Sequence, residues 1–259
     1  MLNLSASLKI ILLAALACLC SLTAFAGPET NAVFKARAEN AFHHTQSLYL
    51  ADPKNSTTAW QFGGACFDLC EFATNDDQKA DLARLGIAAT QQLVDRDPKS
   101  APGHYYLAMN DGALADAWAP SMASYRLVRD IEREFKLSVA LDENFDFAGS
   151  DRCLGLLYRD APGWPISIGN KRKAREFLER AATVAPAYPE NQLSLAESFL
   201  QWRQRDEAEK ALNQLDLGWS AAQVTLTGEI WEKPWRDWKV RRIGARAEFK
   251  RLFQHAPGS

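Results

Sequence analysis

The sequence predicts an all-α fold of stacked antiparallel helix pairs, closed by a further helix at the C-terminus. Two observations predict it: apolar residues recur at helical spacing along most of the chain, and small residues return at a fixed distance. Ala174 and Ala208, for example, lie about 34 residues apart, which is the length of one helix-pair repeat. Such a pair buries its apolar faces only against neighbouring pairs. We therefore expect one helical domain built from repeats.

The clearest repeat lies within residues 147–186, and its pattern returns in the next pair at about 189–216. The residues that carry the repeat packing are Leu154, Gly155, Tyr158, Ala174, Leu178, Ala181, Pro186, Ala196, Ala208 and Leu212, preceded in an earlier pair by Trp60 and Gly64. Small residues stand where paired helices would touch, and larger ones fill the spaces between them. The pattern resembles the tetratricopeptide (TPR) repeat. The expected fold is a TPR-like α-solenoid with about four degenerate repeats.

The apolar periodicity places the elements in order. Helices are expected over 32–50, 57–74 and 78–95, then from Pro102 onward with a return helix over 125–139, then in the pairs 147–186 and 189–216, and finally over 234–253. Residues 217–233 are expected to be irregular. Pro234 suits the first turn of a helix, and the last helix would cap the open core of the stack. The expected divisions are 27–56 for the N-terminal helix, 57–216 for the repeats and 217–259 for the irregular segment and cap, all in one domain, 27–259.

The first 26 residues form a targeting segment. Lys9 precedes the apolar run 10–16, and Ala24-Phe25-Ala26 has the small residues that a signal peptidase requires. Cleavage is expected after Ala26, which would export the mature chain to the periplasm. An uncleaved anchor is an alternative, although the run is short for a span of about 20 residues. Lipidation at Cys18 is another, although the sequence lacks the leucine usual three places before such a cysteine.

The composition argues against a nucleic-acid partner, because a net charge of −2 is far from the basic excess that such binding needs. Three cysteines remain after cleavage: Cys66, Cys70 and Cys153. They are either small buried apolar residues or, for Cys153 with Cys66 or Cys70, one disulfide.

No motif predicts an enzyme, a cofactor or a metal site. His43 and His44 are adjacent, so on a helix they point about 100° apart and cannot ligate one metal as an i, i+4 pair does. Residues 163–171 resemble a phosphate loop poorly, because the spacing is wrong and Pro165 removes a backbone donor. We therefore expect a non-enzymatic protein with no catalytic or cofactor-binding residues.

A binding surface is expected instead on the first helix of each pair, which lines the inner face of a TPR stack. With Trp164 from an inserted loop, the candidate residues for a partner or ligand are Gln61, Asp68, Tyr105, Met109, Arg152, Leu156, Arg159, Trp164, Glu197 and Gln201. Trp118 and Trp164 lie in two insertions, where tryptophan either packs on the body or meets a ligand. The outer face of the last helix is basic. Either this face is simply the solvated side of a cap, or it attracts an acidic partner or an anionic surface.

Two segments, His104–Gly112 and Leu154–Pro165, together with the export signal, resemble the TatT family of periplasmic TPR-like components associated with TRAP-type tripartite transporters. The similarity covers roughly residues 95–215. It implies a helical, non-enzymatic protein that associates with a periplasmic solute-binding protein and encloses a partly apolar channel, with an apolar small molecule as ligand. The expected function is a solute-handling accessory to a transport system. The alternative is a periplasmic scaffold that binds another envelope protein.

Overall fold

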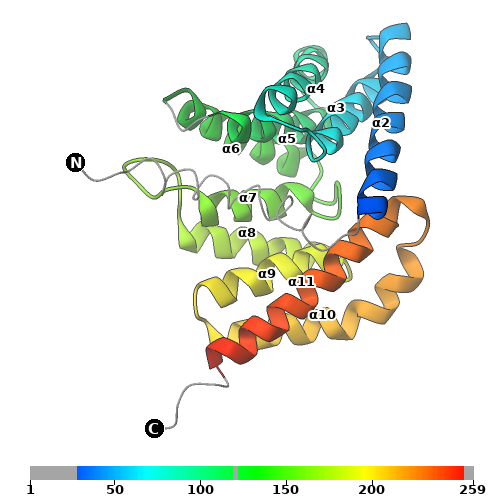
Figure 1. Ribbon diagram of the computed structural model, residues 1–259. Helices are drawn as coiled ribbons and strands as arrows, with labels where there is room; N and C mark the ends of the chain where they lie inside the picture. The colour runs from blue at the N-terminus through cyan, green and yellow to red at the C-terminus, as the bar shows by residue number, and fades with distance from the viewer. Residues whose placement is uncertain (1–27, 119–121, 254–259) are drawn as a thin grey trace. The chain divides into compact units, whose positions relative to one another are not determined.

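The computed structural model describes residues 28–118 and 122–253, and ten helices lie in that part of the chain (Figure 1). The targeting segment with its cleavage site and Cys18 lies outside the described residues. The helices are α2 (Pro28–Ala51), α3 (Ser56–Cys70), α4 (Asp76–Arg96), α5 (Ala101–Ala117), α6 (Met122–Leu141), α7 (Gly149–Asp160), α8 (Lys171–Val184), α9 (Pro189–Gln201), α10 (Arg205–Thr225) and α11 (Glu229–Phe253). No strand is assigned within these bounds. The all-α prediction is confirmed.

The chain divides into two compact units. The first contains α2 to α6 together with Asp160–Asn170, and the second contains Asp146–Arg159 and the chain from Lys171 onward. Each unit is described by itself below. The expectation of a single domain stays a prediction.

Side-chain caps determine where the helices of the first unit begin. Asn55 accepts hydrogen bonds from the backbone N–H groups of Thr57 and Thr58 at the start of α3. Asn75 and Ser100 play the same part for α4 and α5. Each cap satisfies a backbone donor that has no partner within its helix. These caps divide the apolar sequence into separate helices that can fold back on one another.

Small residues let α3, α4 and α5 approach closely. Gly63 faces Thr90, and Gly86 faces the Asn110 side chain. The Asn110 amide is fully buried and donates to the carbonyl oxygens of Gly63 (2.9 Å) and Tyr106 (2.7 Å). The apolar core around this contact includes Phe42, Phe62, Leu93 and Leu114. Buried amides need such partners, and the bond to Gly63 also links α5 to α3.

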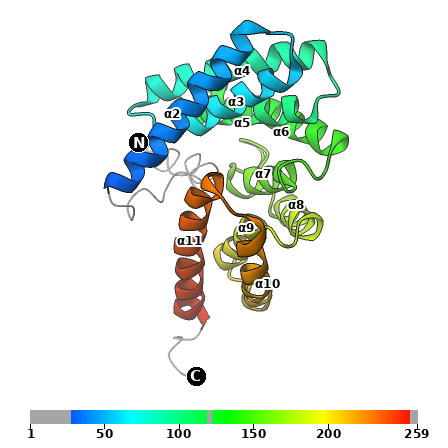
Figure 2. The same ribbon diagram turned by 90° about the vertical axis from the view of Figure 1, so that its right-hand side faces the viewer.

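The second unit repeats the same packing. Gly155 on α7 lies against Leu178 on α8, so that a Cβ at this position would stand 2.5 Å from the Leu178 Cγ. The core continues through α9 and α10, and α11 adds Ala245 and Phe249 to it. In both views α11 runs beside α9 and α10 (Figures 1 and 2). The last helix therefore covers the end of this core, as the sequence predicted.

The prediction of an irregular segment over 217–233 was wrong. Helix α10 continues to Thr225, and α11 begins at Glu229 with Pro234 inside it rather than at its start. Trp219 and Ala222 extend the buried stripe of α10. Trp231 packs against Trp238, and their ring centroids lie 6.0 Å apart. Burial of these aromatic groups outweighs the single backbone hydrogen bond that Pro234 removes.

Candidate functional site

An arginine on α11 fastens this helix to α9. Arg241 donates from Nη1 to both carboxylate oxygens of Glu190 (2.6 and 2.7 Å), and from Nε and Nη2 to Glu197 (2.9 and 2.8 Å). The Arg241 side chain is only 8% exposed. Burial pushes the pKa of Glu190 upward, but the charges of Arg241 and Arg152 outweigh it and hold that pKa below its usual value. The buried charges are thus paired and bidentate, the arrangement that justifies their burial.

An aromatic cluster surrounds this ion pair. The Trp238 indole donates to Glu190 (2.7 Å), and the Trp235 indole donates to the Leu226 carbonyl oxygen (2.7 Å). Ring contacts join these groups into one cluster, whose members are Phe147, Tyr188, Trp219, Trp231, Trp235 and Trp238. Both indole N–H groups are satisfied, so the tryptophans act as a scaffold that holds the start of α11.

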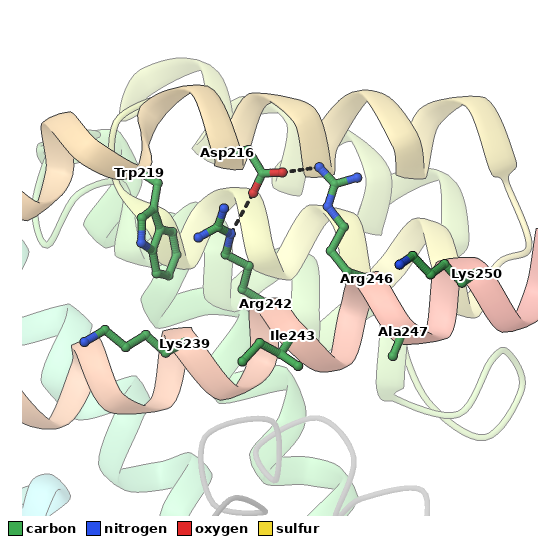
Figure 3. Close-up of a pocket in the computed structure, with 8 residues that line it drawn as sticks. All are labelled: Asp216, Trp219, Lys239, Arg242, Ile243, Arg246, Ala247 and Lys250. Carbon is green, nitrogen blue, oxygen red and sulfur yellow. Dashed lines mark hydrogen bonds and ion pairs between the residues drawn. The ribbon is translucent and has the colours of Figure 1, made fainter.

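An open groove of about 620 Å³ lies between α10 and α11 (Figure 3). On its α10 side, Asp216 accepts hydrogen bonds from Arg242 Nε (2.6 Å) and from Arg246. The Arg242 guanidinium also lies over the Trp219 ring, 4.5 Å from its centroid. Figure 3 shows both arginines reaching across from α11 to the one carboxylate. The groove wall is therefore an ordered surface rather than a set of independent side chains.

The α11 side of the groove carries an exposed stripe. Lys239, Ile243, Ala247 and Lys250 line it, and Ile243 is 71% exposed. The complete lining holds four basic side chains against one acidic side chain: Asp216, Trp219, Lys239, Arg242, Ile243, Arg246, Ala247 and Lys250. Such a surface can bind an anionic group and cover an apolar one in the same place.

A second exposed feature is the loop between α7 and α8. The backbone N–H of Gly169 donates to Pro162 O (2.9 Å), and those of Ile166 and Ser167 donate to Gly163 O. A Cβ on Gly169 would overlap the Ala161 carbonyl oxygen, so only glycine fits there. Trp164 at the tip is 89% exposed and Ile166 is 57% exposed. Of the two interpretations of Trp164, packing on the body is wrong, because the tight neck of the loop directs its tip to solvent.

The other inserted tryptophan behaves differently. Trp118 is half-buried and packs against the core of the first unit, which is the packing alternative of the two.

Three uncharged candidate surface residues are buried instead. Tyr105 is 3% exposed and packs against Phe135 on α6, Leu156 is 5% exposed in the core of the second unit, and Met109 is 8% exposed. The sequence register placed them on an accessible inner face. Neighbouring helices are packed closely enough to cover that face at these positions. A binding role for them stays a prediction.

Three charged candidates have structural partners. Arg152 is buried, donates to Asp146 (2.9 Å) and Asn191 (2.9 Å), and lies over the Tyr188 ring. It thereby holds the turn at residues 146–148, three non-glycine residues that all have positive φ. Arg159 donates to the Ser198 hydroxyl (2.9 Å). Glu197 is held by Arg241, as described above.

The remaining candidates lie on the surface or in the core as follows. Gln61 is half-buried, and Asp68 and Gln201 are exposed. Most of the predicted packing residues have no exposed surface: Leu154, Ala174, Leu178, Ala181, Ala196, Ala208 and Leu212. Tyr158 is 1% exposed, and Gly64 and Gly155 are buried. Trp60 is half-buried, and Pro186 is exposed.

The interface between α5 and α6 holds buried ionisable groups that the sequence did not single out. His104 Nδ1 lies 2.6 Å from Glu134 Oε2, and its Nε2 lies 3.0 Å from the Pro98 carbonyl oxygen. The hydrogen bond to Glu134 raises the pKa of His104. Asp111, also buried, has its pKa raised to about 7 by desolvation and by the nearby charges of Asp130 and Glu134.

Neither a metal nor a disulfide site emerges in residues 28–118 and 122–253. No group of His, Cys, Asp and Glu there is arranged to hold a metal ion. Cys66 and Cys70 are thiols buried on α3, and Cys153 is a half-buried thiol. Burial raises the pKa of the Cys66 thiol far above its usual value. The two α3 cysteines thus occupy core positions, as small apolar residues would. No helix in the same stretch has the length and apolar character needed to cross a membrane.

The groove itself could not be found from the sequence alone. The basic face of the last helix was visible, but residues 217–233 were expected to be irregular. That error removed Trp219 and its part of α10 from the wall that faces α11. The continuing spacing of Leu212, Leu215, Trp219 and Ala222 was the signal that could have extended the helix.

Comparison with solved structures identifies the architecture. The structure of TTC0263, a thermophilic TPR protein of Thermus thermophilus, superimposes with a TM-score of 0.60 at 18% identity, covering 85% of this chain and 94% of that one. The fold is TPR-like. MamA superimposes with a TM-score of 0.50 at 18% identity, covering 76% of this chain and 97% of that one. No protein-family model matches the chain. No curated protein sequence is significantly similar to it.

Proposed function

We propose that this protein is a non-enzymatic scaffold that binds another protein. The TPR-like fold supports the proposal, because stacked helix pairs present long surfaces for contact with a partner. The observation that carries it is the exposed tip of the α7–α8 loop. Trp164 and Ile166 stand in solvent on a loop whose own backbone hydrogen bonds hold it in shape. A rigid exposed tryptophan is the kind of residue that dominates the energy of protein interfaces.

The proposal includes a periplasmic location, supported by Lys9, the apolar run 10–16 and Ala24-Phe25-Ala26. An intact-mass measurement on the protein from a periplasmic extract would test it. A mature chain that begins at Gly27 is expected, and a chain that retains the first 26 residues in the cytosolic fraction would contradict it.

A narrower form of the proposal makes the partner the solute-binding protein of a transport system. The resemblance of His104–Gly112 and Leu154–Pro165 to TatT components supports it. In this form the purified mature protein would also retain an apolar small molecule. Denaturing extraction with mass spectrometry, together with thermal-shift assays across organic acids, would test that addition. If no ligand is extracted and no organic acid raises the Tm, this narrower form is contradicted and only the general scaffold proposal stands.

The scaffold proposal is tested by changing the loop tip. The double variant Trp164→Ala, Ile166→Ser should lose a co-purifying envelope protein that the wild type retains after mild cross-linking in cells. With that partner purified, we expect its Kd to rise at least about tenfold, as for the loss of an aromatic hot spot. Calorimetry would measure this change.

The matched control is Leu50→Ser, which removes a 67% exposed aliphatic side chain from α2. It should keep the partner. Circular dichroism and Tm should match the wild type for both variants, since neither change touches the core. A loop variant that retains every wild-type partner with unchanged Kd would contradict the proposal.

A further inference from the structure

We propose that the groove between α10 and α11 binds an acidic segment of a partner protein, with an apolar side chain of that segment over Ile243. This inference rests on the proposed scaffold function and adds the site and the chemistry of the partner. It uses a different surface from the α7–α8 loop.

The charge of the groove is opposite to that of the chain. The whole sequence has a net charge of −2, but the groove lining combines Lys239, Arg242, Arg246 and Lys250 with the single carboxylate of Asp216. Because Asp216 accepts from both arginines, it fixes the positions of their guanidinium groups in the groove wall. A cationic recess on an acidic protein attracts anionic groups selectively and speeds their approach.

The apolar part of the groove lies between its two lysines. Lys239, Ile243, Ala247 and Lys250 follow one another at helical spacing, so they form one stripe along α11. The two lysines are eleven positions apart, which on a helix is about 16 Å. An extended segment of about five residues spans that length. The stripe therefore fits a short sequence with carboxylates near its ends and an apolar residue between them.

A terminal helix that only capped the core would present a polar outer surface. Instead, four aliphatic residues of α10 and α11 are more than 70% exposed: Leu217, Val224, Ile230 and Ile243. Of these, Ile243 lies in the groove lining. Ile243 is therefore placed to pack against an apolar side chain of an occupant whose carboxylates meet the neighbouring lysines.

Charge and shape favour a foreign acidic peptide over two other occupants. In a two-fold contact between copies of this chain that is centred on the groove, one basic groove would face another, which costs energy. A flat anionic membrane matches the charge, but a flat surface meets the rim of a groove rather than both of its walls, on α10 and α11. A peptide enters the groove and meets both walls.

The test uses a fluorescein-labelled peptide of four Asp-Glu-Leu repeats as probe, with Lys-Arg-Leu and Asp-Glu-Ser repeats as matched comparisons. Fluorescence anisotropy with the full mature chain should give at least about tenfold tighter binding of the acidic-apolar probe than of either comparison. Raising the salt concentration from about 50 to about 300 mM should weaken that binding.

Variants locate the binding. Lys239→Glu with Lys250→Glu, and separately Ile243→Ser, should each weaken the probe at least about fivefold. Lys210→Glu, an exposed charge reversal on α10 outside the groove lining, should change it less than about twofold at the higher salt concentration. Asp216→Asn removes the only carboxylate of the lining and should tighten binding, a gain that misfolding does not produce.

Equal binding of the acidic and basic probes, or an unchanged Kd in the lysine and Asp216 variants, would overturn the inference. So would flotation with phosphatidylglycerol vesicles that requires Lys239 and Lys250 when the peptide does not bind, because the groove would then recognise a membrane. Failure of the two proposals can be told apart. If the groove variants keep the partner that the Trp164 variant loses, the scaffold function stands and the groove assignment falls. If only the groove variants lose a partner, the loop is not the docking surface.

Discussion

Asp111 illustrates how a single buried carboxyl group can set the pH dependence of this fold. Its pKa is raised to about 7 by desolvation and by Asp130 and Glu134, with Arg133 opposing them. In the unfolded chain an aspartate titrates near about 3.9. Folding therefore favours the protonated form. Asp111 does not lower the free energy of unfolding at pH values below its pKa in the unfolded chain, and lowers it most at pH values above its pKa in the folded protein.

We predict that Asp111→Asn stabilises the protein in a pH-dependent way. The gain in the free energy of unfolding should be larger at pH 8.5 than at pH 5, by about 2 kcal/mol, because the charge that the variant removes is fully present only above the raised pKa. Urea unfolding at both pH values would measure it. An equal effect at the two pH values would show that Asp111 is not protonated on folding.

The His104–Glu134 pair acts in the same direction at neutral pH. The pKa of His104 is raised by its hydrogen bond to Glu134, so its stabilisation is present below the unfolded pKa of about 6.5 and is lost as pH rises through the folded value. Burial raises the pKa of Glu134, but the hydrogen bonds from His104 and Arg133 outweigh it and leave that pKa lowered. The Glu134 contribution is therefore lost only as pH falls through this lowered value. The wild type should accordingly be more stable at pH 5.5 than at pH 8.5.

The glycines of the helices differ in how much space surrounds them. A Cβ on Gly86 would overlap the Asn110 amide, whereas one on Gly218 would have no atom within 4 Å. We predict that Gly86→Ala lowers the free energy of unfolding by about 1–3 kcal/mol through overpacking. Gly218→Ala, inside α10, should raise it by about 0.5–1 kcal/mol, because alanine suits a helix better. Thermal unfolding of both variants distinguishes the two signs, and a stabilising Gly86→Ala would contradict the close contact.

At the level of residues, the sequence indicated packing well and exposure poorly. Ala174, Leu178 and Ala208 are fully buried, and helical spacing with residue size was enough to predict this. Tyr105 was placed on an accessible face but is 3% exposed, and Trp164 was left open between packing on the body and meeting a ligand. Whether an aromatic side chain is covered depends on helices and loop geometry distant in the sequence, which spacing along one helix does not contain.

At the level of elements, one buried arginine ties α11 to α9. Arg241 joins it to Glu190 and Glu197 on α9, and removing one member of a buried ion pair typically costs about 3–5 kcal/mol because the other charge stays buried. We predict that Arg241→Ala destabilises α11 in particular. Hydrogen exchange in residues 229–253 should accelerate strongly. Arg251→Ala, which removes an exposed arginine paired with Glu248 on the same helix, should leave exchange there nearly unchanged. Equal effects of the two variants would contradict the proposed role of Arg241.

Helix number and order were predictable from the sequence, and most helix ends fell within a few residues of expectation. The exception, residues 217–233, shows the limit of local rules. A proline and several Thr and Gly residues predict a break in the helix. The packing of Trp231 on Tyr188 and of Trp235 on Trp219 stabilises the helical conformation by more than these residues disfavour it. Tertiary contacts decided these boundaries.

At the level of the whole molecule, repeat proteins owe their stability to contacts between neighbouring helices, so damage should remain local. Gly86→Ala weakens the α4–α5 contact of the first unit, and Gly155→Ala would force the Leu178 side chain away in the second. We predict that each variant accelerates hydrogen exchange mainly in its own unit. For Gly86→Ala the change should concentrate in α3 to α5 and spare α9 to α11, and for Gly155→Ala the pattern should reverse. Mass-spectrometric exchange on both variants measures this directly. Uniform acceleration along the chain in either variant would mean that the two units unfold as one cooperative body, and the division of the chain would then have no thermodynamic counterpart.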